Sequence, residues 1–328
     1  MSLLSAIAEL LKPAPQPDPE VAAATARVIG MVDPLVRAAP RLERQLAEAV
    51  RHALGYCAGL VDALPGPIEI NRQAFGRDPL IHALFATAAD IDEMLGRSQA
   101  VRDFLEKPEC WASDCFCAML AARRQQKKQL GMAQQGDIIR ADVPQEILYF
   151  SDQTLIEPSC RLEVTRQRLQ ARALESLLQA FNAHVDTLRR ERQDLRADLS
   201  VEQAQLLHQP HPAPERETRH TRHLTELDCR LRENAEALMP ENLVVTLADF
   251  LRHPEGALSL TPVSLRVDRL GIVHREPDSD PQVQTLSFPE LTSRDRRQHI
   301  ATLVRVSREE ASAAVQQARD RQKRYIII

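Results

Sequence analysis

The clearest pattern in the chain is a seven-residue repeat of apolar positions in its second half. Two registers carry it: Leu174, Phe181, Leu188 and Leu195 in the first, and Leu178, Val185 and Leu199 in the second, where Arg192 fills the gap. This spacing is that of the a and d positions of a coiled-coil seam. Neither Gly nor Pro occurs between Ser159 and Gln209. The sequence therefore predicts one helix of roughly 70 Å, at about 1.5 Å per residue.

A second apolar stripe follows a proline-rich break that runs from His208 to Pro214. Its members recur at helical spacing and continue past Pro240: Leu224, Leu227, Leu231, Leu238, Leu243, Leu247 and Leu251. Two long helices joined by a short turn favour an antiparallel helical hairpin, which we place at residues 158–252 with its tip at the prolines. The pattern leaves open whether the seam pairs within the chain or with a second copy.

The first third of the chain also carries helical patterns. Apolar residues from Leu42 to Leu64 recur every three or four positions, and Asp78-Pro79 is a favourable helix start. We expect an amphipathic helix and a proline-rich linker at residues 1–19, followed by a helical unit at 20–112.

Two regions on either side of the predicted hairpin have the pattern of strands. Short apolar runs between turn residues predict a small β-meander at 113–157. Alternation such as Val263, Leu265 and Val267 predicts strands at 253–328, which end in a C-terminal helix and tail. The order of the segments indicates that the two strand groups meet in one sheet or in two neighbouring ones. The predicted fold class is α+β, predominantly α-helical, with small antiparallel sheets.

Composition narrows the classes of function. The formal net charge of −4 gives no overall attraction to nucleic acid, so any basic surface must be local. No apolar run approaches the roughly 20 residues that span a bilayer, and the first residues lack the features of a secretion signal. We expect a cytoplasmic protein with free thiols and no membrane span. Glycine-rich nucleotide loops and the common hydrolase motifs are absent from the sequence, and we predict no cofactor and no catalytic residue.

The cysteines Cys110, Cys115 and Cys117 form the most suggestive chemical cluster. Three close thiolates are a candidate site for a metal, although C-x4-C-x-C matches neither the common zinc spacing nor that of iron–sulfur proteins. Buried thiols and a redox pair are the alternatives. A second cluster, His208, His211, His220 and His223, surrounds the predicted hairpin tip and is a minor candidate for metal binding.

Surface patterns supply the remaining candidates. Basic residues gather in two places: Arg123, Arg124, Lys127 and Lys128 in the first, and Arg294, Arg296 and Arg297 in the second. The candidate partner-binding residues are the seam positions Leu174, Leu178, Phe181, Val185, Leu188 and Leu195, the tip residues His208 and His211, and the terminal Ile326, Ile327 and Ile328.

These observations favour a non-catalytic assembly, scaffold or adaptor protein that binds protein partners through the helical arm and its terminal segments, with self-association as a further option. The alternative is a nucleic-acid-associated regulator that uses the arginine-rich clusters. A weaker alternative is a metal or redox protein that uses Cys110 to Cys117.

Overall fold

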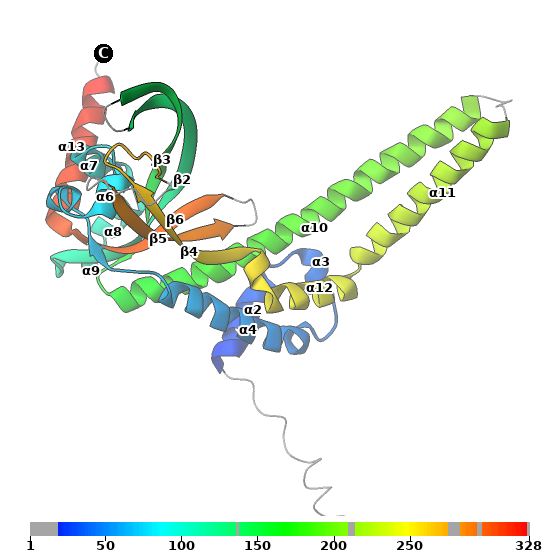
Figure 1. Cartoon of the computed structure of the whole chain (residues 1–328). Helices are drawn as coiled ribbons and strands as arrows, with labels where there is room; N and C mark the ends of the chain where they lie inside the picture. The colour runs from blue at the N-terminus through cyan, green and yellow to red at the C-terminus, as the bar shows by residue number, and fades with distance from the viewer. Residues whose placement is uncertain (1–18, 136–137, 209–213, 275–282, 294–296, 327–328) are drawn as a thin grey trace, which may run out of the picture. The chain divides into compact units, whose positions relative to one another are not determined.

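The computed structural model describes residues 19–135, 138–208, 214–274, 283–293 and 297–326 (Figure 1). About 60% of it is helical and 26% is strand, which confirms a mixed α+β fold in which helices predominate. The chain divides into two compact units: unit 1 is Met1–Tyr56 with Leu174–Pro254, and unit 2 is Cys57–Ala173 with Glu255–Ile328. The predicted helix and linker at 1–19 lie outside the described residues, apart from Pro19.

Unit 1 is built from helices. They are α2 (Pro19–Met31), α3 (Pro34–Arg37), most of α4 (Leu42–Asp62), most of α10 (Leu162–His208), α11 (Pro214–Ala237) and α12 (Pro240–Arg252). The predicted uninterrupted helix is confirmed, because α10 is a single helix of 47 residues. The second apolar stripe is instead divided between α11 and α12. Pro240 lies in the first turn of α12 and has no N–H to donate to a continuing helix.

Unit 2 contains a six-stranded sheet that joins both predicted strand regions. Its strands are β1 (Ile68–Glu69), β2 (Cys115–Gln135), β3 (Ile138–Ser159), β4 (Leu258–Val267), β5 (Gln284–Ser293) and β6 (Gln298–Ser307). They follow the order β3-β2-β6-β5-β4, and β1 pairs in parallel with β6. Because β2 pairs with β6, the strand groups form one sheet, the first of the two arrangements that the segment order left open. In place of a short meander, β2 and β3 form one long antiparallel ribbon, and Gly131 and Pro144 lie inside its strands.

The two ends of this strand path meet again beyond β4. Residues 271–273 run back along β4 and also bond to β3, where Leu148 N donates to Gly271 O at 2.8 Å. The rings of Phe150 on β3 and Phe288 on β5 meet edge to face with centroids 5.6 Å apart, although two strands separate β3 from β5 in the sheet. The sheet is therefore curled, and it has an interior and an exterior face.

Alternation along β2 and β6 assigns residues to the two faces. The interior face carries Phe116, Ala118, Leu120, Ala122, Ile300, Val304 and Val306, all in the main hydrophobic core. The exterior face carries Met119, Ala301 and Leu303, which pack with Val61, Leu64 and Leu169 from the unit 2 ends of α4 and α10. Burial on both faces explains why this part of β2 is an almost continuous apolar run.

Short helices and α13 complete the main core. They are α5 (Arg72–Phe75), α6 (Pro79–Leu84), α7 (Ala88–Arg97), α8 (Gln99–Leu105), α9 (Pro108–Trp111) and α13 (Arg308–Ile326). The predicted helix start is confirmed at Asp78, whose side chain accepts hydrogen bonds from Leu80 N and Ile81 N. Gly96 lets α7 approach α13 closely, because a Cβ there would lie 2.7 Å from Ala314 O.

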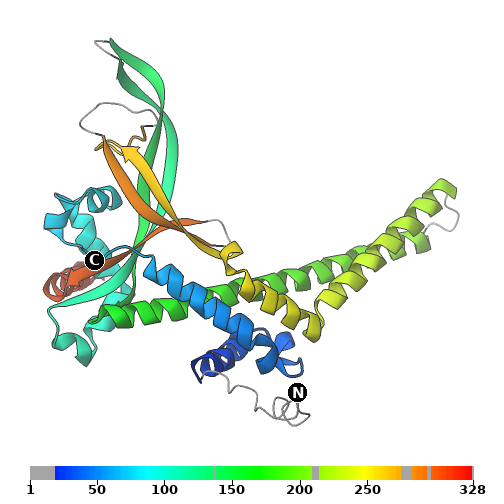
Figure 2. The ribbon, with the colours of Figure 1, turned by 60° about the horizontal axis from the view of Figure 1, so that its bottom comes forward.

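Three bulges bend β3. The pairing with β2 shifts at three places, and each shift passes over two residues of β2 but three of β3. A residue with positive φ lies at each place: Glu157 at 51°, Asp152 at 56° and Asp142 at 60°. Aspartate tolerates this region better than most residues, and each extra residue increases the local twist. Because all the extra residues are in β3, the alternation of faces continues unbroken along β2. Figure 2 shows the curved ribbon extending past the other strands.

No helix in the described part of the chain is both long and apolar enough to cross a bilayer.

Candidate functional site

Helices α10 and α11 run antiparallel and contact each other through polar side chains. Asn234 Nδ2 donates to Leu188 O at 3.1 Å, and Arg230 Nη2 lies 3.3 Å from Glu191 Oε1. Further along the pair, the ring of His220 contacts the carboxylate of Glu202. Residue numbers rise on one helix as they fall on the other, which fixes the antiparallel direction (Figures 1 and 2).

The predicted seam is covered by the chain itself. Five of its residues are buried, namely Leu174, Leu178, Phe181, Val185 and Leu195, whereas Leu188 is half-buried. Phe181 meets the ring of Phe250 on α12, with centroids 5.7 Å apart. Asn182, beside the seam, donates to Met31 O and accepts from Asp33 N. In this conformation the seam is a core of unit 1, and its buried side chains are not exposed to a partner.

The other predicted partner-binding residues lie at the limits of the described chain. His208 ends α10 and Ile326 ends α13, but the structure does not describe their side chains. His211, Ile327 and Ile328 lie outside the described residues. Of the histidine cluster, His220 contacts Glu202, and His223 is exposed on α11.

The three candidate cysteines separate into different surroundings. Cys110 is buried in α9, where its electrostatic neighbour is Cys160. Cys115 and Cys117 share one face of β2, and Cys117 is hydrogen-bonded by Arg305. Burial raises the pKa of both the Cys110 and the Cys117 thiols, which favours the protonated form that binds metals poorly. Among the described residues, no three His, Cys, Asp or Glu side chains are grouped so as to hold a metal ion.

The first basic cluster divides between the two faces of the ribbon. Arg124 points to the interior face and pairs with Glu290 of β5, and both side chains are largely buried. Arg123 and Lys127 occupy odd positions of β2, which belong to the exterior face, and both are exposed. Lys128 lies on the interior side, directly opposite Glu146. In the second cluster Arg297 is exposed, while Arg294 and Arg296 lie outside the described residues.

Polar side chains that sequence reasoning missed connect the strands on the exterior face. Tyr149 Oη donates to Gln125 Oε1 at 2.7 Å, and Gln125 Nε2 donates to Ser151 Oγ at 2.7 Å. The parity of positions in β2 is the signal that separates Arg123, Gln125 and Lys127 from Arg124 and Lys128. Using this signal requires the register of the β2–β3 ribbon, which the sequence did not provide.

A cavity of about 580 Å³ lies in unit 2 beside α6. Phe75, Leu84 and Phe150 contribute apolar walls. The carboxylates that line it hold backbone in place: Asp78 caps α6, and Asp268 Oδ1 accepts from Leu270 N and Ile272 N at 2.9 Å each. These bonds give both acids a structural role.

Comparison of the chain with models of protein families, with curated proteins and with solved structures finds no match.

Proposed function

We propose that this chain is a non-catalytic assembly or adaptor protein in which α10 and α11 form a coiled-coil-like hairpin arm that binds a protein partner. The apolar seam supports an arm folded within one chain, because five of its six residues are buried without a second copy. The polar contacts of Asn234, Arg230 and His220 support a fixed register between the two helices.

The observation that carries this proposal is a charged groove along the helical pair. It has a volume of about 380 Å³, and its lining includes Arg190, Asp194, Asp198 and Arg230. Charges of both signs favour a protein partner over a polyanion, because a single-signed ligand meets repulsion on part of the surface. The partner surface we propose is accordingly the groove, in place of the buried seam.

The experiment compares charge reversals inside and outside the groove. In the full chain, Asp194→Lys with Asp198→Lys reverses two groove charges, and Arg196→Glu reverses an exposed charge of α10 that does not line the groove. Partners of the wild-type chain are captured by cross-linking in cells and identified by mass spectrometry. We expect the double variant to lose at least one partner that Arg196→Glu retains, with unchanged helicity by circular dichroism. Identical partner sets for all three proteins would refute the role of the groove.

Light scattering tests the intramolecular pairing separately. If the arm pairs within one chain, it does not contribute to dimerisation. Replacing residues 196–226 with a short Gly/Ser turn should therefore not change the oligomeric state. A dimer that becomes a monomer on this deletion would show that the arm pairs between chains.

A further inference from the structure

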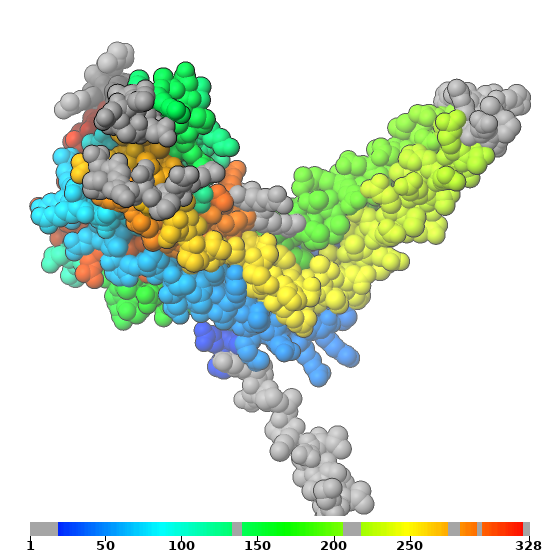
Figure 3. Space-filling model, in the orientation of Figure 1, coloured from blue at the N-terminus to red at the C-terminus, as the bar shows by residue number. Residues whose placement is uncertain are grey.

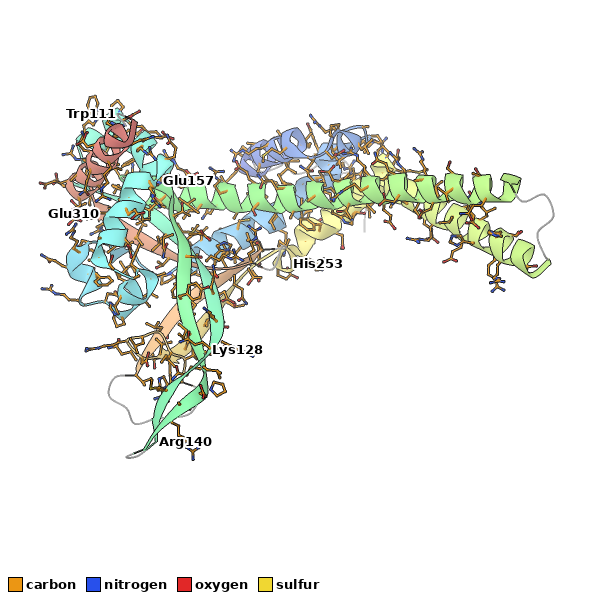
Figure 4. All side chains as sticks on the ribbon, turned by 90° about the horizontal axis from the view of Figure 1, so that it is seen from above. Trp111, Lys128, Arg140, Glu157, His253 and Glu310 are labelled. Carbon is orange, nitrogen blue, oxygen red and sulfur yellow. The ribbon has the colours of Figure 1, made fainter. Side chains whose placement is uncertain are left out.

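Several basic side chains lie together on the exterior face of the β2–β3 ribbon, although other residues separate them in the sequence. Arg123 and Lys127 are exposed at odd positions of β2. The register places exposed Arg140 opposite Ala133, which is another odd position, so the ribbon carries a third cation on the same side. Figure 4 shows Arg140 near the far end of the ribbon and Lys128 partway along it. Asp142 and Asp152 lie in the bulges of β3, and the Asp152 carboxylate accepts a hydrogen bond from Ser151, which is opposite Arg123.

The same face presents groups able to read nucleic-acid bases. Gln129 is exposed, Tyr149 is 40% exposed, and Gln145 is half-buried with its Nε2 donating to Met132 O. Glutamine donates and accepts at once, which suits the edge of adenine in the major groove. The bonds from Tyr149 to Gln125 and from Gln125 to Ser151 restrict the side chains of Tyr149 and Gln125 before any ligand arrives, which lowers the entropy lost on binding.

The opposite face has a different character. Arg124 is engaged by Glu290, and Lys128 is directly opposite Glu146. Beyond them this side carries the exposed apolar residues Leu130 and Met132. By contrast, Arg123, Lys127 and Arg140 have no carboxylate directly opposite them in the register and lie together on one face, which favours a polyanion that approaches this face.

We propose that this exterior face binds duplex DNA, with the ribbon lying in the major groove and Arg123, Lys127 and Arg140 contacting phosphates. Two paired strands with their side chains fit a groove about 12 Å wide, and two-stranded ribbons are an established mode of groove binding. From Arg123 to Ala133 the ribbon spans up to about 33 Å at ~3.3 Å per residue, close to one turn of B-DNA. The space-filling view shows this green ribbon at the surface (Figure 3).

Duplex DNA fits this surface better than duplex RNA does. The major groove of A-form RNA is deep and narrow, and side chains on a two-stranded ribbon do not reach its bases. An acidic protein partner would satisfy the cations but would leave the glutamines of the face without base edges to recognise.

Fluorescence anisotropy with a labelled 24-base-pair DNA duplex tests the proposal on the full chain. The informative pair is Lys127→Gln and Lys128→Gln, because the two lysines are adjacent in β2 and lie on opposite faces. We expect Lys127→Gln to weaken binding several-fold and to reduce the slope of log K against log salt by about 0.9, the value for one phosphate contact. Lys128→Gln should bind within about twofold of the wild type. Arg123→Gln and Arg140→Gln should behave like Lys127→Gln.

Four results would overturn the proposal: no duplex binding at low salt, equal losses for Lys127→Gln and Lys128→Gln, binding of duplex RNA or single-stranded DNA as tight as that of duplex DNA, or competition by polyglutamate as effective as competition by DNA. Circular dichroism and thermal unfolding of each variant confirm that an exposed substitution has left the fold unchanged.

Discussion

Gly271 is the residue on which closure of the sheet depends most directly. Its φ is +79°, and a Cβ at this position would lie 2.6 Å from Leu148 O, the carbonyl beside the backbone bond that joins the strand path to β3. Both the backbone conformation and the approach of two main chains therefore require the absence of a side chain.

Replacing Gly271 with Ala should reduce the free energy of unfolding by about 1 to 3 kcal/mol, because a residue with a Cβ is strained at positive φ and clashes with β3. Urea unfolding monitored by circular dichroism measures the change. Gly59→Ala is the matched control in unit 2: Gly59 lies in α4, and a methyl group at this position would have no neighbour within 4 Å, so alanine should raise helix stability by up to about 1 kcal/mol. Equal midpoints for Gly271→Ala and the wild type would contradict the strain argument.

Cys57 makes the free energy of unfolding of unit 2 depend on pH in the alkaline range. Burial raises the pKa of its thiol from 9.0 to about 12. Above pH 9 the unfolded chain loses this proton while the folded chain keeps it, so the thiol's contribution is complete below pH 9 and is lost as the pH rises toward 12. We expect Cys57→Ala to remove a slope of about 1.4 kcal/mol per pH unit from stability measured over this window.

Thiol labelling provides an independent measurement for Cys57. At pH 8 the exposed Cys229 should react with iodoacetamide in the native protein, and buried Cys57 should react only on unfolding. Mass spectrometry of the labelled peptides separates the two sites. Rapid native labelling of Cys57 would show that its surroundings are open to solvent.

At the residue scale the sequence showed which residue types cluster along the chain, but it did not show which side chains contact each other. It grouped Arg123 with Arg124 because they are adjacent, whereas the structure assigns one to a buried ion pair and the other to an exposed face. The carboxylate that separates them, Glu290, lies 166 positions away in the chain. Likewise Cys110 has Cys160 as a neighbour instead of Cys115 or Cys117. Local spacing carries no information about contacts of this kind.

At the scale of elements, long periodic segments were the most predictable. The heptads predicted α10 because an unbroken apolar stripe without Gly or Pro has few alternatives to a helix. The ribbon was harder to predict, since Gly131 and Pro144 are typical turn residues and yet lie opposite Val143 and Leu130 within paired strands. The bulges of β3 accompany the bending of the ribbon in the folded protein, and no local sequence pattern predicts them.

Asn234 is a buried polar position on α11 that contacts α10. It is buried, its amide donates to Leu188 O, and its Oδ1 has no hydrogen-bond partner among the described residues. A buried polar residue of this kind reduces stability while disfavouring shifted pairings.

Asn234→Leu should therefore raise the midpoint of thermal unfolding of unit 1 by a few degrees, since a buried amide whose Oδ1 has no hydrogen-bond partner among the described residues is replaced by an apolar side chain. Amide hydrogen exchange should at the same time report weaker protection near Leu188, because the register is less strictly specified. The control Glu233→Leu changes a neighbouring exposed residue and should leave protection unchanged. A lower midpoint for Asn234→Leu would indicate that the amide is fully satisfied in solution.

At the scale of the whole molecule, neither unit is one continuous piece of chain. The boundaries at Tyr56 and Ala173 fall within α4 and α10, and unit 2 takes its strands from both sides of the residues that form most of unit 1. β6, from the C-terminal segment, lies between β2 and β5 in the sheet, and the main core draws residues from both segments. Segment order predicted that the two strand groups meet and left open whether they form one sheet or two, and the structure shows one sheet. The groups meet because strands on either side of an insertion are close in space when the insertion leaves and returns to one domain.

This topology predicts that the two segments of unit 2 fold only together. Residues 57–173 alone would expose the edge of β2 that pairs with β6 over nine residue pairs, together with the apolar face of α7 that contacts α13. We expect fragments 57–173 and 255–328, each purified alone, to show no cooperative thermal transition, and the co-expressed pair to copurify and unfold cooperatively. The substitution Val304→Asp in the second fragment, at the centre of β6, should abolish copurification, whereas Glu309→Gln at the exposed start of α13 should not. A native-like transition in 57–173 alone would mean that β2, β3 and the short helices bury enough apolar surface without the C-terminal strands.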